Sequence, residues 1–348
     1  MITARYYPRS FTFLFNAGTS RGVLTTKNSF FIKIWDTDNP DIYGLGEVSL
    51  IPGLSPDNTN LLPEKLDAFT ANPVLFLIQE DLSTFPALKF GIETAFTDLQ
   101  QGGNRILFPS DFTRSQNGIV INGLVWMGDK QTMLTRINEK IETGFTCIKI
   151  KIGAINFSDE IDLLRYIRKN FTSTQLEIRL DANGAFAVSE ALAKLKILSD
   201  FGIQSVEQPI KQGQIQAMAN LCAQSPIPIA LDEELIGVTD FTHQEQLLQL
   251  VKPQYIVLKP SLLGGIHDTR AWILLAQTTH TGWWITSALE SNVGLNAIAQ
   301  FTATQNTLIP QGLGTGQIYE NNIASPLYIN KNQLWYNQNS QWSLTEFS

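Results

Sequence analysis

Several charged side chains of this 348-residue chain occupy strand positions where a buried core is expected. The stretch TCIKIKIG (146–153) has isoleucine at every second position, which gives a strand one apolar face. Because alternate residues of a strand point to opposite sides, Lys149 and Lys151 share the other face. Further strand-like segments end in a charged residue of the same parity: Asp181, Glu207, Asp232 and Lys259. The pattern predicts that ionisable groups gather at one end of a set of strands.

The composition of this set indicates the chemistry that it could perform. Three carboxylates from successive strands can bind one hard dication through oxygen atoms, so we expect Mg²⁺. The sequence has no His–Cys cluster that would favour zinc. An ammonium group beside another ammonium group and near a dication has its pKa lowered, which makes the lysine a usable base. The set therefore favours removal of a proton α to a carboxylate, with the metal stabilising the resulting enediolate.

Each residue also has an ordinary structural interpretation. A Lys-x-Lys pair in a strand is most often a solvated face, and Asp181 before Asn183 and Gly184 resembles a turn or helix cap. Arg179 we interpret as a structural ion-pair partner. Taken together, however, a purely structural interpretation requires five strand-end charges to share one parity by accident. We therefore favour a functional site.

The elements that carry these residues recur with the period of a βα unit. From Ile119 onward, strand-like segments are separated by about 25 to 30 residues that hold a helical pattern. Seven or eight such units predict an α/β fold of the (β/α)₈-barrel type, whose active sites lie at the carboxyl ends of the strands. A doubly wound sheet is the alternative, but the turn NGLVWMGDK after the first strand lacks a phosphate-loop fingerprint.

The N-terminal third has a different pattern and predicts a second, α+β capping domain. Alternating phenylalanines at 11–15, SFFIKIWD at 29–36 and YGLGEVS from 43 are typical of strands, whereas 16–28 is rich in turn-forming residues. The segment Pro86–Gln101 has helical spacing, and the C-terminal tail returns to strand-like segments. We expect a capping domain at 1–117, completed by 319–348, and a barrel at 118–318.

The overall composition argues against several classes of protein. A net charge of −7 without a long basic run argues against nucleic-acid and membrane partners. No apolar run approaches the roughly 18 residues that span a bilayer, and the N-terminus has no signal-peptide pattern. The two cysteines, Cys147 and Cys222, form no scaffold pattern, which favours a reduced, cytoplasmic protein. We expect a small-molecule carboxylate substrate, and we allow for a homo-oligomer.

As a set, five motifs resemble those of the enolase superfamily. They are KIK (149–151), LDAN (180–183), VEQP (206–209), LDEE (231–234) and LKPS (258–261). The pair of lysine motifs is similar to the muconate-lactonising subgroup, and the likeness covers nearly the whole chain. A lysine or histidine base acting with Mg²⁺ is the known scheme of this superfamily.

This resemblance implies a role for each residue. Asp181, Glu207 and Asp232 would be the ligands of Mg²⁺, with Mn²⁺ able to substitute, and Glu233 would support them. Lys151 would be the base on one face of the substrate, and Lys259 would lie on the opposite face. Lys149 would support Lys151 and the substrate carboxylate.

Four further stretches resemble the o-succinylbenzoate synthase family: TSRGVLTTKNSFF (19–31), GEVSLIPGLSPD (46–57), INGLVWMG (121–128) and SALESNVGL (287–295). In that family the first two are cap loops that close over the barrel. The resemblance implies a carbon–oxygen lyase of menaquinone biosynthesis. It would convert 2-succinyl-6-hydroxy-2,4-cyclohexadiene-1-carboxylate to 2-succinylbenzoate by syn dehydration. The implied substrate contacts are Ser20, Arg21, Gly53, Leu54, Asn183, Glu290 and Ser291.

Other functions remain open at this point. An N-acylamino acid racemase uses one lysine on each face of its substrate, and this sequence supplies both. Dipeptide epimerases of the subgroup tend to carry an Asp-x-Asp pair near the end of the barrel, where this chain reads GLGTGQIYENN. A non-catalytic barrel that only binds a partner is disfavoured, because it has no need for five costly buried charges.

Overall fold

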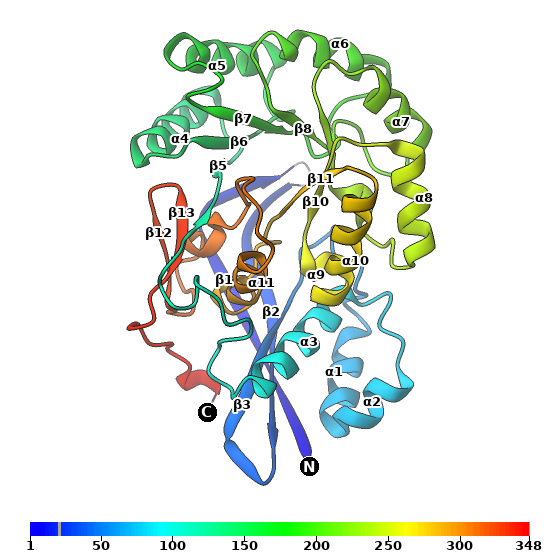
Figure 1. Ribbon diagram of the computed structural model, residues 1–348, viewed down its shortest axis with the longest axis vertical. Coiled ribbons are helices and arrows are strands. Elements are labelled where there is room, and N and C mark those ends of the chain that lie inside the picture. The colour runs from blue at the N-terminus through cyan, green and yellow to red at the C-terminus, as the bar shows by residue number, and fades with distance from the viewer. Residues whose placement is uncertain (20–21, 348) are drawn as a thin grey trace.

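A curled sheet of parallel strands forms the centre of the molecule (Figure 1). The computed structural model describes residues 1–19 and 22–347. The strands, adjacent in sequence order, are β5 (Gly123–Val125), β6 (Cys147–Lys151), β7 (Glu177–Asp181), β8 (Ser205–Glu207), β9 (Ile229–Leu231), β10 (Tyr255–Leu258) and β11 (Gly282–Ile285). Two isolated parallel bridges, Ile121 to Gln311 and Thr286 to Gly312, join the two edges of this sheet. The predicted (β/α)₈-type barrel is therefore confirmed, with its last strand reduced to these bridges.

Helices cover the outside of the barrel, and those from α4 to α8 form the arch at the top of Figure 1. They are α4 (Lys130–Thr143), α5 (Phe157–Asn170), α6 (Val188–Ser199), α7 (Ile215–Gln224), α8 (Phe241–Val251), α9 (Pro260–Leu263), α10 (Gly265–Thr278) and α11 (Asn292–Ala303). Short 3₁₀ turns are η1 (Glu233–Leu235), η2 (Gly314–Gln317) and η3 (Thr345–Phe347). The isoleucines Ile148 and Ile150 of β6 belong to one apolar core with Leu163 and Leu164 of α5. This packing turns the alternate residues of β6 toward the barrel interior.

An antiparallel sheet and three helices form the cap at the bottom of Figure 1. The sheet has the order β1 (Ile2–Thr19), β2 (Gly22–Asp36) and β3 (Asn39–Ser49), and the helices are α1 (Leu62–Ala71), α2 (Pro73–Gln79) and α3 (Pro86–Gln100). Helix α3 packs directly on β3, and a Cβ atom on Gly46 would overlap the carbonyl oxygen of Gly91. Helix α3 also contacts the barrel, because Glu93 accepts hydrogen bonds from Ile266 N (2.6 Å) and His267 N (2.9 Å). The predicted helix at Pro86–Gln101 is thus present and joins the two parts.

The segment 16–28, which we expected to be a turn-rich connection, is largely strand. Its described residues extend β1 to Thr19 and begin β2 at Gly22, with Ala17 paired to Leu24 across a register shift. Glycine, asparagine and serine in this segment suggested turns when each was considered alone. Pairing between the two long strands supplies hydrogen bonds that override those local preferences.

The C-terminal tail contacts both the barrel and the cap. Strands β12 (Leu327–Asn330) and β13 (Gln333–Tyr336) form a sheet with β4 (Ile119–Val120), which precedes the barrel strands. Phe347 instead packs on cap rings, with its centroid 5.0 Å from that of Phe31. Because the tail pairs with one part and packs on the other, the division at residues 117 and 318 stays a prediction.

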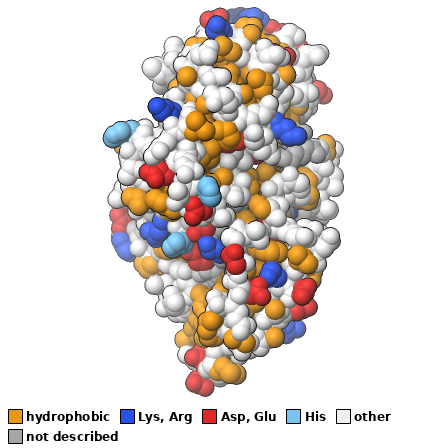
Figure 2. Space-filling model, turned by 90° about the vertical axis from the view of Figure 1, so that its right-hand side faces the viewer, with side chains coloured by type: hydrophobic (Ala, Val, Ile, Leu, Met, Phe, Trp, Pro, Cys, Tyr) orange, Lys and Arg blue, Asp and Glu red, His pale blue; other side chains and the backbone are white. Residues whose placement is uncertain are grey.

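The outer surface shows intermixed side-chain types on the face drawn in Figure 2. Acidic and basic side chains lie interspersed there, with apolar ones between them. Within residues 1–19 and 22–347, no helix combines the length and apolar character that crossing a membrane requires.

Candidate active site

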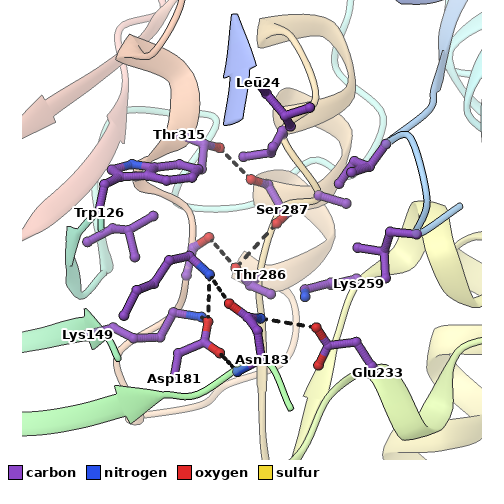
Figure 3. A pocket seen from close by; sticks show the side chains of 18 of the residues that line it. Leu24, Trp126, Lys149, Asp181, Asn183, Glu233, Lys259, Thr286, Ser287 and Thr315 are labelled. Atoms are coloured by element: carbon purple, nitrogen blue, oxygen red, sulfur yellow. Dashed lines mark hydrogen bonds and ion pairs between the residues drawn. The ribbon is translucent and has the colours of Figure 1, made fainter. Parts of the chain in front are cut away.

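A cavity of about 180 Å³ lies where the carboxyl ends of the barrel strands meet the cap (Figure 3). Its barrel walls carry polar residues from several strands: Lys149, Lys151, Asp181, Asn183, Glu233, Lys259, Thr286, Ser287 and Thr315. Cap residues Leu24, Ile51 and Leu54 cover it with apolar side chains. Strands β6 and β10 are separated by three others in the sheet, so Lys151 and Lys259 approach the cavity from opposite walls.

Lys149 lies against two carboxylates at the base of this site. Its Nζ atom is 3.1 Å from both Glu207 oxygens and 3.1 Å from Asp181 Oδ2. Burial alone would lower the pKa of Lys149, but the charges of Asp181 and Glu207 raise it above the usual lysine value. Lys149 therefore stays protonated and acts as a fixed positive charge.

Lys151 is held by a short chain of polar contacts. Its Nζ atom donates to Asp181 Oδ2 (2.9 Å) and to Asn183 Oδ1 (2.6 Å), and Asn183 Nδ2 donates to Glu233 Oε1 (3.0 Å). Asn183 has a φ of 42°, a left-handed conformation that non-glycine residues adopt mainly in special turns. The ammonium also lies 5.9 Å from the ring centre of Trp126. These contacts orient Lys151 toward the cavity.

Lys259 follows strand β10 and forms an ion pair with Asp232 Oδ2. Burial lowers the pKa of Lys259, but the charges of Asp232 and Glu233 outweigh this and raise it. We expected neighbouring ammonium groups to lower the lysine pKa values. The charge of Lys149 does lower the pKa of Lys259, but the paired carboxylates outweigh it, and the dication that the expectation included would act in the same lowering direction.

The three expected metal ligands are buried at successive strand ends. Asp181, Glu207 and Asp232 are each exposed by 2% or less. Burial and the charge of Asp181 raise the pKa of Glu207, although the charge of Lys149 acts in the opposite direction. Asp232 Oδ1 has no hydrogen-bond partner among the described residues. Three buried carboxylates, one of which has an oxygen without a hydrogen-bond partner among the described residues, fit a hard dication such as Mg²⁺.

The same carboxylates do not form a ready-made cluster. Within residues 1–19 and 22–347, no three histidine, cysteine or acidic side chains are grouped closely enough to hold a metal ion. The lysine ammonium groups are inserted between these acids instead. The residue types therefore fit Mg²⁺, and binding it requires the ion pairs to rearrange.

Gln208, which follows the expected ligand Glu207 in the motif VEQP, connects two of the strand ends. It is fully buried, and its Nε2 atom donates to Glu234 Oε2 and Ile210 O, both at 3.0 Å. Its Oε1 atom accepts from Asp232 N (3.1 Å) and Glu234 N (3.3 Å). A side chain that both donates and accepts is needed here, so glutamine places the backbone of Asp232.

The other residues expected to contact substrate lie in different surroundings. Leu54 and Asn183 line the cavity. Gly53 is not among the lining residues, although its sequence neighbours Pro52 and Leu54 are. Glu290 and Ser291 are fully buried and bonded to other residues, outside the described cavity lining. Ser20 and Arg21 lie outside the described residues.

Trp126 and Thr315 line the cavity although they were not predicted from sequence, whereas Ser287 belongs to SALES (287–291), which was expected to line the pocket. Ser287 Oγ and Thr315 Oγ1 form a hydrogen bond on the wall opposite the acids, near Trp126 (Figure 3). Trp126 has the same strand parity as Leu124, which also lines the cavity, so the parity rule applied to INGLVWMG could have found it. Thr315 could not be found this way, because it lies in the 3₁₀ turn η2 rather than in a strand.

Known proteins share both the sequence and the fold of this chain. Residues 132–332 match the family described as enolase C-terminal domain-like. The o-succinylbenzoate synthase of Desulfotalea psychrophila is 47% identical over 90% of this chain and 93% of its own. A crystal structure of MenC from that organism superposes with a TM-score of 0.85, covering 96% of this chain and 99% of that one.

More distant relatives share the fold. A hydrophobic dipeptide epimerase of Enterococcus faecalis is 26% identical over 74% of this chain and 68% of its own. A dipeptide epimerase structure from that organism, complexed with Mg and a dipeptide, has a TM-score of 0.83 at 20% identity and covers 96% of each chain. The chain thus belongs to the enolase superfamily and, within its muconate-lactonising subgroup, to the family of o-succinylbenzoate synthases.

Proposed function

We propose that this protein is a carbon–oxygen lyase that dehydrates 2-succinyl-6-hydroxy-2,4-cyclohexadiene-1-carboxylate to 2-succinylbenzoate. The observation that carries the proposal is the pair Lys151 and Lys259 on opposite walls of a cavity above buried carboxylates. The similarity to a curated o-succinylbenzoate synthase over 90% of the chain supports the same reaction. This step would belong to menaquinone biosynthesis, in the cytoplasm, with a small carboxylate as the substrate.

Lys151 is the proton carrier in this proposal. Its Nζ atom, when neutral, takes the proton from the ring carbon that bears the carboxylate. The same nitrogen then returns this proton to the hydroxyl group, which leaves as water from the same face of the ring. Lysine ends as it began, and the products are 2-succinylbenzoate and one water molecule. Asp181 and Asn183 keep the nitrogen in place through their two hydrogen bonds.

Lys259 is the electrostatic partner on the opposite face. Its raised pKa favours the charged form, so it stabilises the carbanionic state without exchanging a proton. Lys149 adds a second fixed charge near the substrate carboxylate. This division of roles follows from the different contacts of the three lysines.

The proposed metal ligands are Asp181, Glu207 and Asp232, supported by Glu233. A bound Mg²⁺, or Mn²⁺ in its place, would stabilise negative charge on the substrate carboxylate. Leu24, Ile51 and Leu54 exclude water from above. Ser287 and Thr315 are proposed to offer hydroxyl groups to the oxygen atoms of the succinyl arm. Ser20, Arg21 and Gly53 are proposed to contact substrate.

Racemisation of N-acylamino acids is the second candidate, because a lysine approaches from each wall. Dipeptide epimerisation is less well supported, since the described wall from Gly312 to Thr315 presents no carboxylate to hold an amino group.

A side-by-side assay tests the proposal. The purified protein with Mg²⁺ is given the cyclohexadiene substrate and, separately, N-succinylamino acids. We expect rapid formation of 2-succinylbenzoate and slow or absent racemisation. Racemisation that is faster than dehydration would overturn the assignment, as would loss of proton exchange on only one enantiomer in Lys259→Ala.

A further inference from the structure

A buried polar cluster lies between the cap sheet and the barrel, away from the cavity. We call it the cap–barrel cluster, and each member is exposed by 2% or less. Its members are Lys27, Ser29, Glu47 and Ser49 from the cap, and Ser261, Glu290 and Ser291 from the barrel. The proposed chemistry uses none of their side chains. Burying two carboxylates and one ammonium is unfavourable unless all their partners are in place.

The cap contributes the ammonium group and one carboxylate. Lys27 Nζ donates to Ser29 Oγ (3.3 Å) and to Ser49 Oγ, and Ser29 Oγ donates to Glu47 Oε1 (2.9 Å). Burial lowers the pKa of Lys27, while the charges of Glu47 and Glu290 act in the opposite direction. Glu47, which this network holds, lies beside Glu290 of the barrel, because a Cβ atom on Gly294 would meet Glu290 Cγ at 2.7 Å and Glu47 Oε2 at 3.0 Å.

Glu47 attaches the cap to the start of helix α11. Its carboxylate accepts from Ser291 N (3.0 Å), Ser291 Oγ (2.6 Å) and Gly294 N (3.0 Å). Amide groups in the first turn of a helix lack partners inside the helix, and a carboxylate there is favourable. A cap residue thus satisfies barrel groups that would otherwise be buried without a partner.

Glu290 connects the cluster to the start of helix α9. It accepts from Ala288 N (2.7 Å) and from Ser261 Oγ. Ser261 lies in the single turn of α9, where Leu262 N and Leu263 N donate to the carbonyl oxygen of Lys259 at 2.8 and 3.1 Å. The position of Lys259 therefore depends on the turn that Glu290 holds.

We propose that Lys27, Glu47, Glu290 and Ser261 are positioning residues that couple docking of cap strand β2 to the placement of Lys259. Strand β2 carries both Lys27 and Leu24, which covers the cavity. If β2 is displaced, the Lys27–Glu47 network is withdrawn from beside Glu290, and the α9 turn that Glu290 holds through Ser261 loosens. The same contacts therefore close the cavity with Leu24 and place Lys259 on its wall. The kinetic part of this inference rests on the proposed dehydratase function.

Ser261→Ala is the kinetic test, because it removes one hydroxyl group outside the cavity. We expect kcat for dehydration to fall about tenfold while KM changes less than about twofold, since Lys259 acts mainly on the transition state. The matched control is Thr302→Val, which removes another buried hydroxyl, one that donates only to Ile298 O within α11. An unchanged kcat in Ser261→Ala, or an equal fall in the control, would overturn the coupling.

Lys27→Met is the second test, and its readout is amide hydrogen exchange rather than activity. We expect faster exchange in the peptide that contains Leu262 and Leu263, with unchanged exchange in α5 on the far side of the barrel. Unchanged exchange at α9, or a uniform increase everywhere, counts against the proposal. If Lys27→Met does not fold, the exchange experiment is done with Ser29→Ala, which leaves all charges in place.

The two tests separate the inference from the proposed function. A wild-type protein without dehydratase activity would refute the function, and the exchange experiment would still decide the coupling. An active wild type with unaltered variants would leave the function standing and refute the coupling alone.

Discussion

Replacing Gln208 by glutamate is expected to destabilise the folded protein strongly at pH 8, although the two side chains have nearly the same shape. The change converts Nε2, which donates to Glu234 Oε2 and Ile210 O, into an oxygen that faces the same two acceptors. The residue is fully buried, so water cannot replace the lost donors.

The magnitude follows from these two contacts. A lost hydrogen bond to a charged group costs about 1.5–3 kcal/mol and one to a neutral carbonyl about 1 kcal/mol. The carboxylate introduced by Gln208→Glu would be a buried charge without a partner, which costs about 3–5 kcal/mol. Because these terms overlap, we expect a loss of about 4 kcal/mol, a large part of the 5–15 kcal/mol typical of folded domains.

Urea unfolding followed by tryptophan fluorescence measures this loss, since the chain has seven tryptophans. Gln216→Glu, on the exposed side of α7, is the matched control and should change stability by less than about 0.5 kcal/mol. If Gln208→Glu unfolds at the same urea concentration as this control, the role assigned to Gln208 in joining β8 to β9 is wrong.

The remaining predictions concern catalysis, the metal and pH. Lys151→Ala should lower the dehydration rate about a thousandfold, measured as 2-succinylbenzoate formation, and near-normal turnover would refute the base assignment. Exhaustive chelation should abolish activity and added Mg²⁺ should restore it; activity that survives chelation would exclude a metal-dependent reaction. Burial raises the pKa of Asp57 to about 6 from 3.8, so the folded state binds its proton more tightly than the unfolded chain. Stability should therefore fall by about 2 kcal/mol as pH rises from 4 to 7, and Asp57→Asn should remove that part of the pH dependence of urea unfolding.

The strand alternation explains why the central residues could be found from sequence. Alternation is a local property, so the side of β6 that carries Lys149 and Lys151 follows from the isoleucines between them. The βα period likewise predicts that the strand ends gather at one rim. The curvature that closes the barrel brings those ends into one site, as the cavity lining shows.

Other features depend on contacts that the sequence does not display. Gln208 acquires its role from Glu234 in the turn η1 after the neighbouring strand β9, and Glu290 is joined to the cap–barrel cluster by Ser261. The described residues of the polar segment 16–28 form strand because residues of the partner strand lie opposite them. Each of these outcomes depends on contacts between residues that are far apart in the chain, and local sequence patterns do not show those contacts.

The bridges that replace the last barrel strand have a consequence for how this pocket can evolve. Thr286 and Gly312 pair through a single bridge, and a Cβ atom on Gly312 would overlap Thr286 Oγ1. Beyond Gly312 the wall is the turn η2 rather than a hydrogen-bonded strand. Substitutions at Gly314 and Thr315 can therefore reshape the substrate pocket without unpairing a strand or moving the lysines. New substrate preferences are expected to arise by mutation at Gly314 and Thr315, since a Cβ atom on Gly314 would meet its nearest neighbours at 3.7 Å, an ordinary contact distance.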